Sequence, residues 1–225
     1  MNILAIDTST EACSAAIWID GACRSQYALT PQGHSERILP MCDELLAEAG
    51  MSLEQMDCLA FGRGPGSFTG IRVGTAVIQG IAFAVDRPVV AVSSLRALAQ
   101  NAFSQWGHKN IAAAIDARMN EVYWGLYQLD EYSIMQLVGE ERLSPPEQVT
   151  LPQTQIFGAG SAWASYTQTL QTSLGSKLDA FNAECYPTAS SIALIAEKEF
   201  SLGHAQSVEA IQPVYLRDRV AQAKV

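Results

Sequence analysis

A glycine-rich loop between a short apolar run and a long one most strongly limits what this chain can fold into. The loop contains four glycines and one proline and reads Phe61-Gly62-Arg63-Gly64-Pro65-Gly66-Ser67-Phe68-Thr69-Gly70-Ile71-Arg72. Glycine adopts backbone conformations that other residues avoid, and proline fixes its own φ angle. The pattern therefore predicts a strand, a tight loop and then a helix that Ser67 or Thr69 caps.

Two roles for this loop remain open. Unpaired N–H groups at a helix start attract anions, so the loop is a candidate phosphate or nucleotide site. A tight turn that lets two helices pack closely explains the same glycines. The loop lacks the Gly-Lys-Ser/Thr ending of a Walker loop and the glycine spacing of the dinucleotide fingerprint.

The composition indicates a soluble protein with a large core that does not hold nucleic acid by itself. Of 225 residues, 48% are apolar and 16% are charged. The chain has 14 basic and 23 acidic residues and a net charge of −9, whereas autonomous nucleic-acid binders usually present a basic face. We therefore expect tRNA or DNA contact only through a partner.

Cysteine usage and hydropathy favour a cytoplasmic location. The five cysteines are odd in number and form no C-x-x-C pair, which is typical of reduced thiols. The apolar stretch around 76–85 is interrupted by Gln79 and followed by Asp86, so we expect no membrane span.

The chain contains the same unit twice. Residues 3–18 and 112–127 each form an apolar run ending in Ile-Asp, at Asp7 and Asp116, followed by a polar turn and a second strand. Such long-range similarity suggests a duplicated domain. We predict a first lobe over 1–106 and a second over 107–225, with the C-terminal tail packing back on the first.

The element order supports the duplication. In the first half we predict strands over 2–7, 12–19, 23–29, 57–61 and 88–92, and helices over 35–49, 70–85 and 94–105. In the second half we predict strands over 111–116, 121–128, 133–140, 154–157 and 178–182, and helices over 161–171 and 189–200. Where the first half has its first helix, we predict only a single turn in the second half, over 144–149. The order is βββαβαβα twice, with this one helix lost.

This order resembles the superfamily of actin, sugar kinases and Hsp70 ATPases, a two-lobed α/β fold related to ribonuclease H. The resemblance implies a nucleotide cleft between the lobes, with the Asp7 and Asp116 turns facing phosphate and metal. Asp7 and Ser9 suit that role, although Asp7 bonding its own backbone is the alternative. The second turn has Ala117, Arg118 and Met119 where the superfamily has glycine. We therefore expect vestigial phosphate turns, with the roles of Arg118 and the Gly158–Gly160 turn open.

The sequence gives no pattern for a metal or a nucleophile. His34, His108 and His204 are isolated, and a capping or surface role is expected for His34. No G-x-S-x-G elbow is present.

One helix is unusually rich in small residues. The segment 70–85 carries Gly70, Gly74, Ala76, Gly80, Ala82 and Ala84. Interior glycines cost a helix about 1 kcal/mol each relative to alanine, so close packing must compensate. Together with helix 35–49, this helix suits a contact with a related subunit.

Several landmarks resemble the TsaB (YeaZ) family over nearly the whole chain. They are the glycine loop from Gly62 to Arg72, Ala5-Ile6-Asp7-Thr8-Ser9, His34-Ser35-Glu36, Ala114-Ile115-Asp116-Ala117-Arg118, Glu121-Val122-Tyr123 and Pro213-Val214-Tyr215-Leu216-Arg217. The resemblance implies an accessory subunit for transfer of threonylcarbamoyl to the adenosine next to the anticodon of ANN-decoding tRNAs. TsaD, a paralogue, is the implied catalytic partner, and the ATPase TsaE joins them. The subunit has no catalytic residue, metal or cofactor of its own, although a nucleotide at the interface with TsaD is possible.

The resemblance places the TsaD contact on the two helices. We assign Glu36, Leu39, Thr69, Arg72, Val73 and Ala76 to this interface, which would form a homodimer when TsaD is absent. Two other functions are weighed. Asp7, Gly158 and Gly160 are compatible with an ATP-binding kinase or ATPase, and the missing metal-ligand pair argues against a metallopeptidase-like hydrolase.

Overall fold

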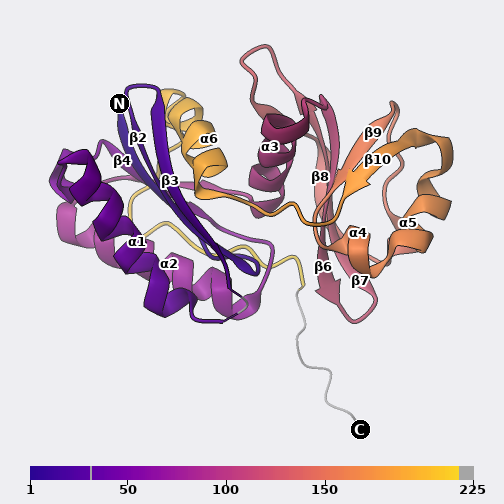
Figure 1. The fold of residues 1–225 in the computed structure, drawn as a ribbon, viewed down its shortest axis with the longest axis horizontal. Coiled ribbons are helices and arrows are strands. Elements are labelled where there is room, and N and C mark those ends of the chain that lie inside the picture. Colours follow the sequence, from indigo (N-terminus) through magenta and orange to yellow (C-terminus); the bar gives the residue numbers. More distant parts are fainter. Residues whose placement is uncertain (31, 218–225) are drawn as a thin grey trace, which may run out of the picture.

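Two five-stranded sheets form two lobes in the computed structural model, which describes residues 1–30 and 32–217 (Figure 1). The first half comprises β1 (Asn2–Asp7), β2 (Ala12–Ile19), β3 (Ala22–Leu29), α1 (His34–Ala49), β4 (Cys58–Gly62), α2 (Phe68–Val85), β5 (Val89–Val92) and α3 (Ser94–Trp106). The second half comprises β6 (Asn110–Arg118), β7 (Glu121–Leu129), β8 (Met135–Ser144), β9 (Ile156–Ala159), α4 (Ala162–Ser165), α5 (Thr167–Leu174), β10 (Leu178–Asn182) and α6 (Ala189–Ser201). Short 3₁₀ turns span Leu53–Gln55, Pro146–Gln148 and Gly175–Lys177.

The two sheets have the same topology. Their strand orders are β3-β2-β1-β4-β5 and β8-β7-β6-β9-β10. In each sheet the central strand, β1 or β6, pairs antiparallel with the next strand in sequence and parallel with the strand on its other side. The duplicated fold predicted from the sequence is therefore confirmed.

The last helix of each half packs on the sheet of the other half. Side chains of α6 enter the core on one face of the first sheet, while α1 and α2 cover the opposite face. Side chains of α3 pack on the second sheet, whose other face is covered by α4 and α5. Figure 1 shows α3 beside the second sheet and α6 beside the first. The sequence repeat divides the chain between residues 106 and 107. That this division is also the boundary between two domains stays a prediction.

The start of α2 is one place where local sequence explains structure directly. The helix begins at Phe68, two residues earlier than predicted, because the hydroxyl of Ser67 accepts a hydrogen bond from the Gly70 N–H at 3.3 Å. Ser67 is thus the cap. The buried side of α2 faces the first sheet and includes Ile71, Ile78 and Ile81.

α2 is longer than the apolar stretch around 76–85 on which our expectation rested. Its 18 residues have a mean hydropathy of 1.5, so the helix meets the length and composition criteria for a membrane span, contrary to our expectation. A core helix of a soluble protein meets the same criteria. A third of α2 is buried, on the side that faces the first sheet.

The predicted helix 161–171 is broken. Its two parts, α4 and α5, meet at Tyr166, whose φ of −130° is not helical. The hydroxyl of Ser165 donates to the Asp116 carboxylate at 2.9 Å, and the Tyr166 hydroxyl lies 3.3 Å from the same group. The break therefore lets two neighbouring side chains reach one carboxylate on β6.

The glycine loop packs backbone against backbone on the turn between β1 and β2. The Ser67 N–H donates to the Ser9 carbonyl at 2.7 Å, and the Thr8 hydroxyl donates to the Gly70 carbonyl at 2.7 Å. A Cβ atom on Gly66 would lie 2.1 Å from the Ser9 oxygen, and one on Gly70 would lie 2.0 Å from the Thr8 oxygen. The glycines therefore allow close packing, but of a loop on a turn and not of two helices.

Substituting two glycines of the same helix should have opposite effects on stability. Gly70→Ala should destabilise the protein by about 1–3 kcal/mol, because the new methyl group has no room. Gly80→Ala is the matched control, since nothing lies within 4 Å of a Cβ atom there. It should stabilise the helix by about 0.5–1 kcal/mol. Urea unfolding at low protein concentration measures both, and equal effects would contradict the packing role of Gly70.

Candidate functional site

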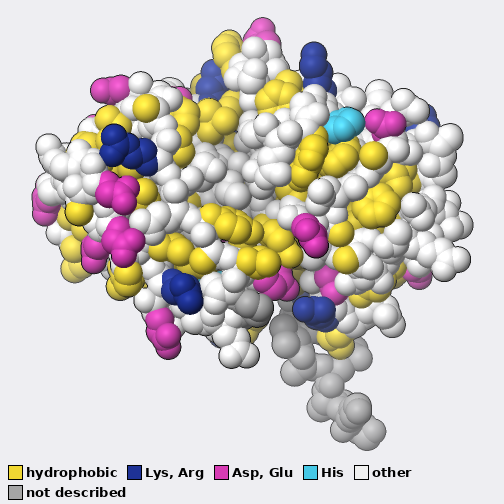
Figure 2. All heavy atoms as spheres, viewed as in Figure 1, with side chains coloured by type: hydrophobic (Ala, Val, Ile, Leu, Met, Phe, Trp, Pro, Cys, Tyr) yellow, Lys and Arg dark blue, Asp and Glu magenta, His cyan; other side chains and the backbone are white. Residues whose placement is uncertain are grey.

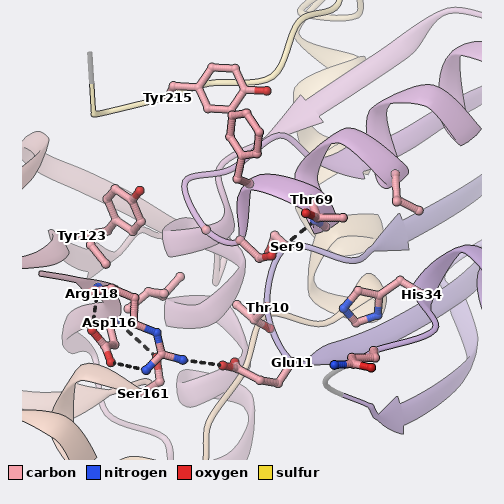
Figure 3. A pocket seen from close by; sticks show the side chains of 18 of the residues that line it. Ser9, Thr10, Glu11, His34, Thr69, Asp116, Arg118, Tyr123, Ser161 and Tyr215 are labelled. Atoms are coloured by element: carbon pink, nitrogen blue, oxygen red, sulfur yellow. Dashed lines mark hydrogen bonds and ion pairs between the residues drawn. The ribbon is translucent and has the colours of Figure 1, made fainter. Parts of the chain in front are cut away.

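A cleft of about 690 Å³ lies where the two lobes meet. Its walls are the β1–β2 turn from Ser9 to Glu11, the β6 end from Ile115 to Arg118, the starts of α1 and α2, and the tail residues Tyr215 and Arg217 (Figure 3). The superfamily resemblance expects a nucleotide in this position. The question is whether the two aspartates face the cleft as phosphate or metal chemistry requires.

Asp7 does not face the cleft. It is fully buried, and its carboxylate accepts hydrogen bonds from the N–H and the hydroxyl of Ser9, both at 3.0 Å. The backbone of Gly62 covers it, since a Cβ atom there would lie 1.9 Å from a carboxylate oxygen. Of the two alternatives for Asp7, the structure has the one in which the carboxylate bonds its own turn.

Burial also changes the acidity of Asp7. Desolvation raises its pKa from 3.8 to about 7, and the hydrogen bonds from Ser9 oppose this increase. No basic side chain contributes to the shift. The carboxyl group is therefore a poor phosphate or metal partner in this fold.

Asp116 is held by its own neighbours. Its carboxylate accepts from the Arg118 N–H at 2.8 Å, from the Arg118 guanidinium at 2.9 Å and from Ser165 at 2.9 Å. The exposed guanidinium also lies 3.8 Å from the carboxylate of Glu11, on the opposite wall of the cleft (Figure 3). Arg118 thus joins the two turns, and Asp116 has few lone pairs left for a ligand.

The Gly158–Gly160 turn is explained by packing. A Cβ atom on Gly158 would lie 2.4 Å from the Trp163 ring, and one on Gly160 would lie 2.4 Å from the Ala114 carbonyl. Gly160 also has a φ of 111°, which favours glycine. These glycines let Trp163 and β6 approach the turn, so contact with adenosine is not needed to explain them.

The three histidines lie apart. His34 lines the cleft at the start of α1, and burial lowers its pKa. His108 stacks on Phe157 with ring centroids 4.4 Å apart, and His204 is 2.6 Å from the Glu199 carboxylate. Within residues 1–30 and 32–217, no three His, Cys, Asp or Glu side chains are grouped as metal ligands. The expectation that this chain holds no metal stays a prediction.

The residues assigned to a partner interface all lie at least partly at the surface of α1 and α2. Exposed or half-buried positions are Glu36, Leu39, Thr69, Arg72, Val73 and Ala76. The helices pack against each other beside the first sheet (Figure 1). Phe83 is not among the interface residues predicted from the sequence, but it is 78% exposed on the same stripe of α2. The exposure of Phe83 could have been predicted from the sequence, because Phe83 falls outside the i, i+3, i+4 pattern of the buried isoleucines.

The buried carboxyl group of Asp7 predicts how stability depends on pH. Its pKa is higher in the folded protein than in the unfolded chain, so folding favours the protonated form and the free energy of unfolding falls as pH rises from about 4 to 7. A shift of this size corresponds to an upper limit of about 4 kcal/mol. Asp7→Asn should remove most of this pH dependence, measured by urea unfolding between pH 4 and 7.5.

The matched control for that experiment is Asp43→Asn, on the exposed side of α1. Its unfolding curve should keep the pH dependence of the unsubstituted protein. If Asp7→Asn has the same slope as the unsubstituted protein, Asp7 is not the buried titrating group.

Comparison with known proteins identifies the family. The family model described as TsaD, tRNA N6-adenosine threonylcarbamoyltransferase, matches residues 28–225. The tRNA threonylcarbamoyladenosine biosynthesis protein TsaB of Escherichia coli K12 is 42% identical, over 100% of this chain and 98% of its own. The TsaB protein of Haemophilus influenzae is 40% identical, over 100% of this chain and 97% of its own.

A solved structure has the same fold. YeaZ from Pseudomonas aeruginosa is 45% identical and superposes with a TM-score of 0.90, covering 96% of this chain and 99% of that one. Together with the two curated relatives, this match supports the duplicated two-lobed fold. The chain belongs to the TsaB (YeaZ) family of tRNA threonylcarbamoyladenosine biosynthesis proteins.

Proposed function

We propose that this chain is a non-catalytic subunit that docks on TsaD and, together with TsaE, supports threonylcarbamoyl transfer to the adenosine next to the anticodon of ANN-decoding tRNAs. The observation that carries the proposal is the exposed apolar stripe of α2. The rest of the site supports a role through this surface and not through chemistry in the cleft.

The docking face is defined by one residue of α1 and one stripe of α2. Its members are Leu39, Thr69, Arg72, Ala76, Gly80 and Phe83. The α2 members recur every three or four residues, opposite the side that is buried on the first sheet. Small side chains in the middle of this stripe let a partner helix approach closely, and Phe83 at its end offers a large apolar anchor.

Burial of this face in a complex is favourable. Phe83 is 78% exposed and Leu39 is 45% exposed, so both gain by leaving water. Burying one such side chain contributes about 1.5–3 kcal/mol. Because the same face can pair with itself about a two-fold axis, we also propose a homodimer when TsaD is absent.

The cleft supports the non-catalytic part of the proposal. Asp7 is sealed by Gly62 and Ser9, and Asp116 is held by Arg118 and Ser165. Neither carboxylate is arranged to hold metal and phosphate together. Thr69 and Val73 line the cleft, and Thr69 also belongs to the docking face, so a nucleotide shared with TsaD would fit at this edge.

The charge distribution supports tRNA contact through the complex. The net charge is −9, and Figure 2 shows basic side chains scattered singly over the face in view. Phosphate binding needs several basic groups close together. We propose that TsaD supplies the tRNA contact, in the cytoplasm.

One substitution tests the docking face. Ala76→Glu places a long charged side chain in the middle of the small-residue stripe, where it fills the space that a partner helix needs and adds a charge that the interface would have to desolvate. It should weaken binding to purified TsaD at least about tenfold by calorimetry, a loss of about 1.4 kcal/mol. The modification of tRNA by a system reconstituted from this chain, TsaD and TsaE should fall with it.

Ala164→Glu is the matched control, because Ala164 is an exposed helical alanine of the second lobe. It should bind TsaD like the unsubstituted protein. Unchanged binding by Ala76→Glu would reject this face, whereas absence of binding by the unsubstituted chain would reject the proposed function itself.

A further inference from the structure

The C-terminal motif forms a strap, which we define as Ile211–Arg217. It begins in the core of the first lobe, where Ile211 is 1% exposed and its carbonyl accepts from the Gln79 side chain at 3.3 Å. The Val214 N–H then donates to the Arg63 carbonyl at 2.8 Å. A Cβ atom on Gly64 would lie 2.8 Å from the Val214 oxygen, so the strap runs closely along the glycine loop.

The middle of the strap reaches the docking face. The rings of Tyr215 and Phe68 lie 5.7 Å apart between centroids, and the Tyr215 hydroxyl accepts from Nε of Arg72 at 3.0 Å. The Arg72 guanidinium lies 3.6 Å from the centre of the Phe68 ring. Tyr215 is 39% exposed, so it extends the edge of the docking face.

The end of the strap holds the second lobe. Nη2 of Arg217 donates to the carbonyls of Ala117 and Arg118 at 3.1 and 3.3 Å and to the Glu121 carboxylate at 2.6 Å. The Arg217 side chain is only 16% exposed. The residues that Arg217 contacts form the turn that follows Asp116 at the wall of the cleft.

The held turn has an unusual backbone. Arg118, Met119 and Asn120 have φ angles of 62°, 57° and 58°. Residues other than glycine rarely adopt this region, and three in succession need support from their surroundings. Arg217 binds the carbonyl just before this segment and the first carbonyl within it, so the strap is one source of that support.

We propose that the docking face includes Tyr215, and that the strap couples docking of the paralogous partner to the arrangement of the two lobes around the cleft. One side chain, Arg217, fixes the strap to the second lobe, and the neighbouring Tyr215 completes the surface around Arg72. Release of Arg217 removes the order of Tyr215, and the partner meets an incomplete surface. This inference rests on the proposed function for the identity of the partner.

The partner chemistry follows from Arg72. It is the only charged residue of α2, and it lies at the apolar stripe beside Phe68 and Tyr215. Burial of a guanidinium requires an acceptor. The partner should therefore present a carboxylate or carbonyl oxygen at this point, next to an apolar surface that covers Ala76 and Phe83.

Coupling of this kind is reciprocal. A change at the cleft turn alters docking, and docking alters the cleft turn by the same factor. Binding of TsaD should therefore slow amide exchange at residues 117–121, even though the docking face lies on the first lobe.

The test uses the full chain with Arg217→Met, which keeps an apolar stem and lacks the guanidinium. Affinity for TsaD should fall about fivefold to fiftyfold by calorimetry, within the range of ordinary allosteric coupling. In the free protein, amide exchange should become faster in both segments that Tyr215 and Arg217 contact, at residues 68–72 and at 117–121. Arg142→Met is the matched control, because Arg142 is an exposed arginine of the second lobe whose ion pair is with Glu140.

Two further variants separate the strap from general stability. Arg217→Lys keeps the charge but loses the fork of donors, so it should restore little of the affinity. Glu121→Gln removes only the ionic partner of Arg217 and serves as the second variant if Arg217→Met fails to fold. It should shift exchange in the same two segments by a smaller factor.

The outcomes distinguish this inference from the proposed function. If the unsubstituted chain does not bind TsaD, the proposed function fails, and the exchange experiment on the free protein still decides whether the strap links the two segments. If Arg217→Met binds TsaD like the unsubstituted chain while Ala76→Glu does not, the docking face stands and the strap proposal is overturned. Faster exchange confined to 117–121 also overturns it.

Discussion

The contact between the glycine loop and the β1–β2 turn is the constraint on which the rest of the structure depends. Two backbones meet with no side chain between them, and the Ser67 N–H and the Ser9 carbonyl satisfy each other at 2.7 Å. This contact fixes the start of α2, and with it which side of the helix faces the first sheet. It also places Gly62 over Asp7. A buried carboxyl group and an outward apolar stripe are thus two consequences of one packing arrangement.

The same arrangement fits the docking role that we propose for a scaffold related to nucleotide-binding proteins. The groups that would meet phosphate and metal are occupied by the protein itself: Asp7 by its own turn, and Asp116 by Arg118 and Ser165. The helix that follows the loop keeps an apolar face that no part of residues 1–30 and 32–217 covers, with Phe83 at 78% exposure. The occupant that we propose for this face is a paralogous partner, because a related subunit can offer an equivalent helical face.

Local pattern predicted most of the fold, and long-range contact explains the rest. The apolar runs of β1 and β2, the alternation at the start of β7 and the apolar stripe of α1 identify strands and helices, because burial produces these patterns locally. The break at Tyr166 was not predictable, since its hydrogen-bond partner Asp116 lies on a distant strand. The sequence also did not predict that α3 packs on the second sheet and α6 on the first. The spacing of apolar residues in a helix shows that one face is apolar, but it does not show which sheet covers that face. Asp7 stayed ambiguous because nothing local indicates that the Gly62 backbone seals it.

The most direct test of the central claim is the exchange rate of the Ser67 amide proton in the free protein, followed by NMR with and without millimolar ATP and Mg²⁺. If the Ser67 N–H is hydrogen-bonded to the β1–β2 turn, its proton exchanges slowly, near the rate set by global unfolding. Addition of nucleotide then leaves both its exchange rate and its chemical shift unchanged. Fast exchange that ATP and Mg²⁺ slow down would contradict the account, because it would show an open anion-binding loop in place of a packed one.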